Sequence, residues 1–147
     1  MTEPMHLYDA VVLKEWVDFN GHMNDAAYAI PFSRAIDALM DQIGLDAEGR
    51  KVTNHTLFTL AMQLRFHHEV KEGAPLKVSG QILEIDAKRL RLYQWLRHGE
   101  TGALLATSVA AQNAAWPGKP VRLIIGIGPA NNETALPWLG FAAGYTW

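Results

Sequence analysis

The chain has 147 residues, with 13 Lys and Arg against 15 Asp and Glu, a formal net charge of −2 and no cysteine. Its length supports one domain with its own core, because roughly 68% of the unfolded surface is buried at this size. The near-neutral charge argues against a nucleic-acid binder, and the lack of cysteine excludes a thiol nucleophile and a Cys-ligated metal site. No apolar run approaches the roughly 20 residues that span a bilayer. The charged first 15 residues do not predict a signal peptide, so we expect a cytoplasmic protein.

The N-terminal third predicts a strand, a polar loop and a long helix. Residues 7–13 are rich in β-branched and aromatic side chains and predict a strand, and the polar run 14–24 predicts a loop. The apolar positions then take the spacing of one helical face: Phe32, Ile36, Leu39, Met40 and Ile43. Asn24 or Asp25 can cap this helix and Gly44 can end it. Pro31 predicts a kink or a short separate first turn.

After the polar connection 46–54, four strands joined by short turns are predicted. Strict alternation over 58–67 indicates a half-buried strand, with one apolar face formed by Phe58, Leu60, Met62, Leu64 and Phe66. The next strands are predicted over 76–85, with a bulge at Ile82–Leu83, over 90–97, and over 104–115. The tail predicts a break at 116–120, a short strand at 121–127 and irregular structure beyond 131.

This order of elements predicts an α+β domain, in which one antiparallel sheet of about five strands wraps around a long central helix. The apolar stripe of the helix then faces the concave side of the sheet. A single helix covers only part of such a sheet, so a second copy is expected to cover the rest. The expected assembly is therefore a homodimer or a dimer of dimers.

The most informative segment is the loop 16–24, directly before the helix. A helix N-terminus presents unpaired N–H groups that favour an oxyanion. Asp18 lies a few residues upstream, and Gly21 allows the backbone to approach a ligand closely. A carboxylate beside amide donors suits an acyl-transfer hydrolase, in which Asp18 either activates water or attacks directly.

The pattern Asp18-x-x-Gly21-x-Met23-Asn24-x-x-x-Tyr28 resembles hotdog-fold acyl-CoA thioesterases of the 4-hydroxybenzoyl-CoA thioesterase type, over about residues 7–115. Segments 15–24, 57–60 with 68–71, and 86–90 are similar to the betainyl-CoA thioesterases of carnitine degradation. The resemblance implies one hotdog domain over residues 1–147, with 116–147 as a C-terminal tail. It also implies active sites at a dimer interface and no cofactor or metal, coenzyme A being part of the substrate.

By this resemblance, Asp18 is the catalytic carboxylate and the amide near Asp25 is the oxyanion donor. The backbone from Gly21 to Asp25 forms the rest of the site, and His22 and Asn24 support it. Each residue also has a structural interpretation. Asp18 and Asn24 are common in turns and caps, and His22 is as well explained by a structural hydrogen bond.

Aromatic and basic side chains are candidates for substrate binding. Aromatic rings attract quaternary ammonium groups, and the candidate rings are Trp16, Tyr28, Phe58, Tyr93 and Trp95. For Phe58, a place in the strand's core stripe is the competing interpretation. The basic patch Lys88, Arg89 and Arg91 suits the CoA phosphates, or is a solvated hairpin end. The betainyl-CoA group has a glutamate where this chain has Ala61, so a carboxylate that could hold a cationic acyl group is missing.

Metal binding is not predicted. His67 and His68 are adjacent and point to opposite faces of a strand, and no carboxylate completes a ligand set with His55. Two other functions remain open. One is a hotdog hydratase or dehydratase with an Asp–His pair, and the other is a non-catalytic acyl-CoA-binding module. The Asp18-x-x-Gly21 spacing favours the hydrolase.

Overall fold

The computed structural model describes residues 3–86 and 89–113. Two short 3-10 helices and two α-helices follow the first strand, and the remaining strands form the second half. In chain order the elements are β1 (Met5–Val11), η1 (Lys14–Trp16), η2 (Asp25–Tyr28), α1 (Ala29–Gln42), α2 (Ala47–Thr53), β2 (Phe58–Phe66), β3 (Pro75–Ile85), β4 (Arg89–His98) and β5 (Leu104–Asn113).

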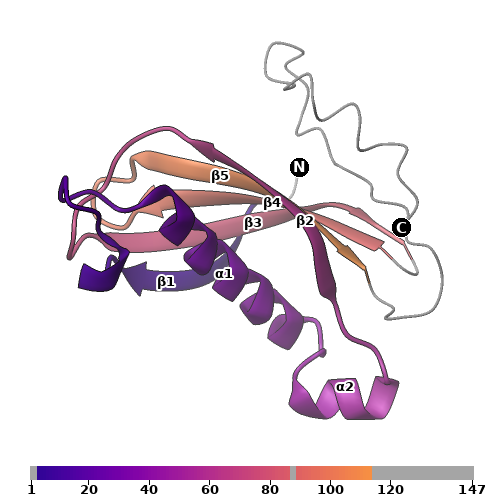
Figure 1. Ribbon diagram of the computed structural model, residues 1–147. Coiled ribbons are helices and arrows are strands. Elements are labelled where there is room, and N and C mark those ends of the chain that lie inside the picture. Colours follow the sequence, from indigo (N-terminus) through magenta and orange to yellow (C-terminus); the bar gives the residue numbers. More distant parts are fainter. Residues whose placement is uncertain (1–2, 87–88, 114–147) are drawn as a thin grey trace.

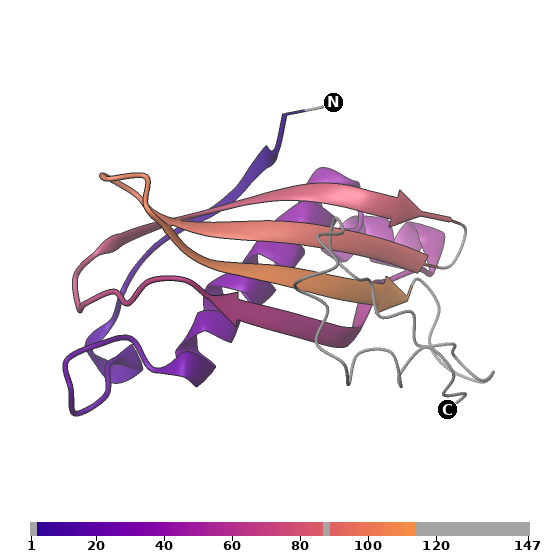
Figure 2. The ribbon, with the colours of Figure 1, turned by 90° about the horizontal axis from the view of Figure 1, so that it is seen from above.

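The strands form one antiparallel sheet in the order β1-β3-β4-β5-β2, so β1 and β2 are its edges. Helix α1 crosses one face of this sheet, and α2 lies beyond the end of α1 (Figures 1 and 2). The predicted hotdog arrangement of a long helix against a five-stranded sheet is confirmed. The predicted break at 116–120, the strand at 121–127 and the end of the strand at 114–115 lie outside the described residues. Among those described, neither α1 nor any other helix has the length and apolarity needed to cross a membrane.

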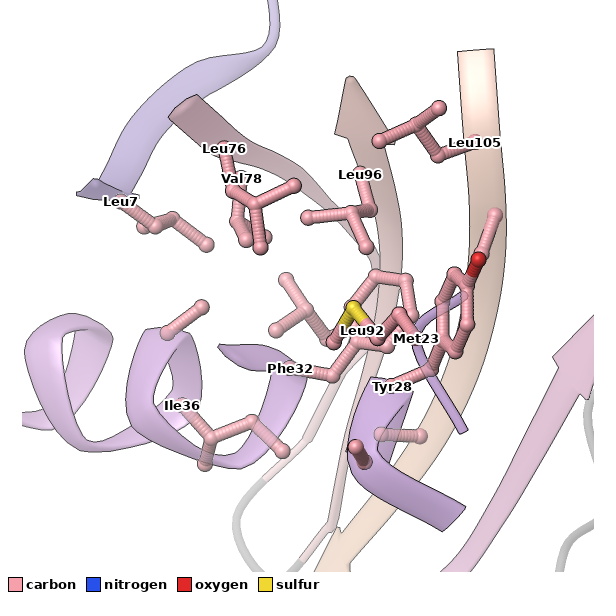
Figure 3. Close-up of a cluster of buried hydrophobic side chains, with 14 of the residues drawn as sticks. Leu7, Met23, Tyr28, Phe32, Ile36, Leu76, Val78, Leu92, Leu96 and Leu105 are labelled. Carbon is pink, nitrogen blue, oxygen red and sulfur yellow. The ribbon is translucent and has the colours of Figure 1, made fainter. Parts of the chain in front are cut away.

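The core lies between α1 and the sheet. Phe32 and Leu39 of α1 are fully buried in one core cluster with Leu92 and Leu96 of β4, and Figure 3 shows Phe32 beside Leu92. The predicted apolar face of the helix is thus confirmed over most of its length. It fails at Ile43, which is 44% exposed, because α1 has ended there and Ile43 is its C-cap.

Both ends of the helix follow the capping prediction. The Asn24 side chain accepts a hydrogen bond from the Ala26 amide and caps η2, which forms the predicted separate first turn. Pro31 lies in the first turn of α1, where its missing N–H would have no intrahelical partner. Gly44 follows the C-cap with φ of +78°, the left-handed conformation that glycine adopts at low cost.

Two local predictions differ from the structure, and one is confirmed. The connection 46–54 contains the helix α2, capped by Asp46, whose side chain accepts from the Gly49 amide at 2.8 Å. In β2, the register shifts between Thr59 and Ala61, so Phe58 does not share a face with the apolar residues after the bulge and is 47% exposed. The predicted irregularity of β3 is present, between Ile82 and Glu84.

Candidate active site

The loop between η1 and η2 folds back on itself as a tight turn. Val17 forms a bridge with Met23, and the Asp18 amide donates to the His22 carbonyl oxygen at 2.9 Å. The Gly21 amide donates to the Asp18 carbonyl oxygen at 3.0 Å, with φ of +80° at Gly21. A side chain at this φ would strain the backbone, so Gly21 is required for the turn.

The Asp18 carboxylate is held by the backbone of its own turn. Its Oδ1 atom accepts hydrogen bonds from the amides of Asn20 at 2.8 Å and of His22 at 3.4 Å. Its Oδ2 atom is bonded to none of the described residues, and the residue is half-buried. The turn interpretation of Asp18 is confirmed by the contacts of Oδ1, and Oδ2 is left for the catalytic role, which stays a prediction.

The backbone amides of the predicted oxyanion site are not equivalent. Four of the five already donate hydrogen bonds: those of Gly21, His22, Met23 and Asn24. Within the part of the chain that the structure describes, the amide of Asp25 has no acceptor. Asp25 is the first residue of η2, where amides have no intrahelical partner. The geometry thus narrows the candidate oxyanion donor to one amide.

Two side chains cap the amide that follows Asp25. The Oδ1 atoms of Asn24 and Asp25 lie 3.0 and 2.8 Å from the backbone nitrogen of Ala26. Asn24 therefore supports the site by fixing the start of η2, as the capping interpretation predicts. The contribution expected of Asp25 comes from its backbone, since its carboxylate is exposed and turned toward Ala26.

Tyr28 is placed at the inner side of the loop. It is 4% exposed, and its ring packs edge-to-face on Phe66 with centroids 5.1 Å apart. Its hydroxyl donates to the His68 carbonyl oxygen at 3.2 Å. Burial, with a smaller effect of the Glu69 carboxylate, raises the pKa of Tyr28, so its phenol stays neutral and keeps this hydrogen bond at physiological pH.

His22 has a partner that the sequence did not predict. Its Nδ1 atom lies 3.2 Å from Oε2 of Glu69, in the connection between β2 and β3. Glu69 belongs to one of the segments that are similar to the betainyl-CoA group, and no other sequence signal distinguishes it. The contact forms because the connection between β2 and β3 packs against the loop. The spacing of residues along the sequence could therefore not reveal it.

The structure does not bring the five aromatic candidates together. Trp16 and Tyr28 pack against the core on the α1 side of the sheet. Tyr93 and Trp95 form a pair with centroids 4.6 Å apart. They alternate along β4 with residues buried under α1, so this pair lies on the opposite face. Phe58 is exposed at the start of β2.

The basic patch is partly neutralised by carboxylates. Arg89 Nε donates to Asp86 at 2.7 Å and Arg91 donates to Glu84 at 3.2 Å, while Lys88 lies outside the described residues. Both arginines line a small, open pocket together with Glu84 and Gln112. The Nε atom of Arg91 and the Nε2 atom of Gln112 are buried there without a partner among the residues described. Because these two nitrogens are shielded from solvent, a ligand at this patch can reach only the exposed parts of the Arg89 and Arg91 side chains, which are 45% and 23% exposed.

Two further positions can be placed. Ala61 pairs with Ala111 of β5, directly after the bulge in β2, and is half-buried. His67 and His68 lie at the end of β2, and the His68 ring nitrogen Nδ1 is 2.8 Å from the Leu104 carbonyl oxygen. The described residues contain no group of three or more His, Asp or Glu side chains arranged to hold a metal ion.

Comparison with known proteins decides the class of this fold and site. The family model of the thioesterase-like superfamily matches residues 12–112. The chain belongs to this superfamily. It is 48% identical over 108 residues to the betainyl-CoA thioesterase of Pseudomonas aeruginosa, a match that covers 74% of this chain and 68% of the relative. The predicted fold and the predicted enzyme class, a thioester hydrolase, are confirmed.

Two further relatives extend the comparison. The L-carnitine dehydrogenase/betainyl-CoA thioesterase of Agrobacterium fabrum is 41% identical over 104 residues, which are 71% of this chain and 21% of that protein. The chain therefore spans about a fifth of this longer relative. A Staphylococcus aureus protein solved in complex with CoA is 30% identical, with a TM-score of 0.69, covering 78% of this chain and 72% of that one.

Proposed function

We propose that the protein hydrolyses betainyl-CoA to betaine and coenzyme A, as a step in carnitine degradation. The support for this acyl group is the 48% identity to a betainyl-CoA thioesterase. A second relative combines the same activity with an L-carnitine dehydrogenase. A CoA thioester is a metabolite of the cytoplasm, and we place the protein there.

The observation that carries the proposed chemistry is that one folded loop holds an amide and a carboxylate oxygen that no described residue bonds: the N–H of Asp25 and Oδ2 of Asp18. The thioester carbonyl oxygen accepts a hydrogen bond from the Asp25 amide, which stabilises the negative charge that develops there. Asp18 removes a proton from water as the water oxygen attacks the carbonyl carbon, or attacks that carbon itself. In the first route the C–S bond then breaks, the proton passes from Asp18 to sulfur, and the carboxylic acid and CoA are released. In the second route the C–S bond breaks to leave an acyl–Asp18 anhydride and a CoA thiolate, and water then hydrolyses the anhydride, giving the carboxylic acid and the proton that the thiolate takes up.

We assign the acyl group and the CoA phosphates of the substrate to different parts of the protein. Trp16 and Tyr28 are the aromatic candidates that lie beside the loop, so we assign the acyl group to their neighbourhood. The partly exposed guanidinium groups of Arg89 and Arg91, which line a pocket, offer donors for CoA phosphates. The CoA complex of the Staphylococcus aureus relative supports a CoA ligand for this fold.

We further propose that two copies associate through the edge strand β2. Among the strands of residues 3–86 and 89–113, β2 has a neighbour on one side only, and exposed strand edges pair readily with another chain. Phe58 and Phe66, at its two ends, are 47% and 50% exposed. Association would cover these rings and place the second copy beside Tyr28, which packs on Phe66.

The substrate is tested with a panel of acyl-CoA esters in which thiol release is followed with a chromogenic reagent. The panel contains betainyl-CoA, short aliphatic esters and aromatic esters. We expect the highest kcat/KM for betainyl-CoA, by at least about ten-fold over a neutral ester of the same size. A preference for a neutral ester would refute the betainyl assignment, and thiol release from no ester would refute hydrolysis. The panel also separates hydrolysis from hydration, which releases no thiol.

Asp18 is tested by substitution with asparagine. Asn keeps an Oδ1 acceptor for the amides of Asn20 and His22, so the turn and the thermal unfolding midpoint should be retained. We expect kcat to fall by at least about 10²-fold, because the amide can neither take a proton nor attack. Near-wild-type hydrolysis of every ester would remove Asp18 from the mechanism.

A further inference from the structure

The side chains of His22 and Glu69 form an ionisable pair, and His22 lies in the same tight turn as Asp18. The Nδ1 atom of His22 lies 3.2 Å from Oε2 of Glu69, with side-chain exposures of 30% and 69%. At this distance the negative charge of the carboxylate favours the imidazole tautomer that carries its proton on Nδ1, the nitrogen that faces Glu69. An imidazole that carries its proton on Nδ1 leaves Nε2 with a lone pair.

The backbone next to Glu69 is fixed to the loop on its C-terminal side. The Met23 amide donates to the Val70 carbonyl oxygen at 2.8 Å, and His22 forms a bridge with Lys71. Both contacts join the residues at His22 to the residues just after Glu69. Main-chain hydrogen bonds therefore fix the backbone of His22 relative to that of Glu69, which keeps the ring and the carboxylate within reach of each other.

The N-terminal side of Glu69 is anchored to a different part of the fold. The Tyr28 hydroxyl donates to the His68 carbonyl oxygen, and the raised pKa of Tyr28 keeps that donor protonated. The amide of His68 donates to the Leu105 carbonyl oxygen at 3.2 Å. Glu69 is thus held between two anchored neighbours, although its own side chain is exposed. Such an arrangement is typical of a residue that orients a ligand-facing group.

We propose that Glu69 is a positioning residue that keeps the proton of His22 on Nδ1, so that Nε2 accepts a hydrogen bond from the attacking water. This inference rests on the proposed function, since it adds a second acceptor to the site of Asp18. The water donates one O–H group to Asp18, which takes that proton and returns it to the leaving sulfur. It donates the other to Nε2, and that hydrogen remains on the carboxylic acid product. His22 therefore orients the water and undergoes no net change.

The first test reads the His22 tautomer and does not require activity. Ring nitrogen shifts are recorded by ¹⁵N NMR at about pH 8, where most imidazoles are neutral, and the His22 signals are assigned from their loss in His22→Gln. We expect a protonated Nδ1 and an unprotonated Nε2 in the wild type. In Glu69→Ala we expect most of the proton population on Nε2. Glu72→Ala is the control, because Glu72 is exposed and lies in the same connection three residues later. A proton on Nε2 in the wild type, or no change in Glu69→Ala, would overturn the proposal.

The second test is a double-mutant cycle in the thiol-release assay. We expect Glu69→Ala to lower kcat by about ten-fold with KM changed by less than about two-fold, because the water is oriented only for the chemical step. In the His22→Gln background, Glu69→Ala should have no further effect on kcat. Additive losses would show that Glu69 acts independently of His22 and would also overturn the proposal. If Asp18→Asn stays active while the NMR result is as expected, the proposed mechanism fails but the positioning by Glu69 stands.

Discussion

At the scale of single residues, the proposed mechanism depends on one backbone N–H group, that of Asp25. The preceding residue, Asn24, has φ of −62° and ψ of 143°, the extended conformation that a residue before proline adopts. Asp25 is also the first residue of its helix, the position at which proline is favoured. A proline at position 25 should therefore remove the N–H group and leave the loop in place.

We predict that Asp25→Pro lowers kcat by about 10²- to 10³-fold, the usual effect of removing one oxyanion donor. Asp25→Ala keeps the amide and removes only an exposed carboxylate, so it should retain most of the activity. Thiol release and thermal unfolding of both variants give the measurement. A proline variant that folds and remains active would show that another group stabilises the oxyanion.

A second prediction at this scale concerns Ser108, a buried residue on the α1 side of β5. Its hydroxyl is bonded to no residue in the described ranges, and an unpaired buried hydroxyl costs about 1–3 kcal/mol. We expect Ser108→Ala to raise the free energy of unfolding by up to about 1 kcal/mol in urea titrations. Ala110→Ser places a hydroxyl on the same face two residues later and should lower it by a similar amount. A loss of stability in Ser108→Ala would reveal an acceptor for the hydroxyl.

Local chemistry explains which site residues could be predicted from the sequence. Asp18, Gly21 and Asn24 act on their immediate neighbours, as a turn acceptor, a residue with positive φ and a cap, so their spacing was sufficient. Glu69 was not predicted, because it lies 47 positions after His22 in the sequence. The two side chains come together only because the connection between β2 and β3 packs against the loop. The Tyr93–Trp95 pair was assigned to the acyl pocket on residue type alone, and β4 turns both rings to the other face of the sheet.

At the scale of elements, the connection between α1 and α2 depends on Gly49. A Cβ atom at this position would lie 1.8 Å from the Gly44 carbonyl oxygen. Alanine normally stabilises a helix by about 1 kcal/mol over glycine, but here it must displace the end of α1. We predict that Gly49→Ala speeds amide hydrogen exchange in α2 by at least about ten-fold.

The control for Gly49 is Lys51→Ala in the same helix. Lys51 is exposed and pairs only with Glu48, at 2.9 Å, so its removal should change stability by less than about 0.5 kcal/mol. Slower amide exchange in Gly49→Ala than in the wild type would contradict the predicted clash. It would show that alanine stabilises this helix over glycine, as it does in most helices.

The two elements that differed from prediction did so for different physical reasons. In α2, Gly49 disfavours the helical conformation. The stabilising effect of the Asp46 N-cap and of the left-handed C-cap at Asn54 is larger, so the helix forms. In β2, the apolar alternation continues through Thr59 and Ala61 without a break, although the backbone contains a bulge there. A bulge changes the face of every residue before it, and the sequence of one strand does not contain the pairing that creates it.

At the scale of the whole molecule, the periodicities predicted the layers but not the order of the strands. The alternation in β4 and the stripe of α1 required a helix packed on a sheet, and the buried face of β4 confirms it. The placement of β1 beside β3, and of β2 at the far edge, arises from long-range pairings. It is this order that leaves β2 with an open side and gives the proposed dimer a specific location.

The dimer predicts a mass of about twice 16.3 kDa in analytical ultracentrifugation. We expect the two-fold axis near the middle of β2 (Phe58–Phe66), which would place Gln63 near its own counterpart. We therefore expect Gln63→Lys to weaken association by at least about ten-fold through like-charge repulsion. Gln81→Lys is a matched control. Gln63 of β2 pairs with Val109, Val109 pairs with Tyr93, and Tyr93 pairs with Gln81 of β3, so the two glutamines lie in one row across the sheet. Gln81 is on an inner strand and not at the β2 edge. Equal weakening by both variants would place the interface on the sheet face rather than at β2, and a monomeric wild type would exclude the dimer.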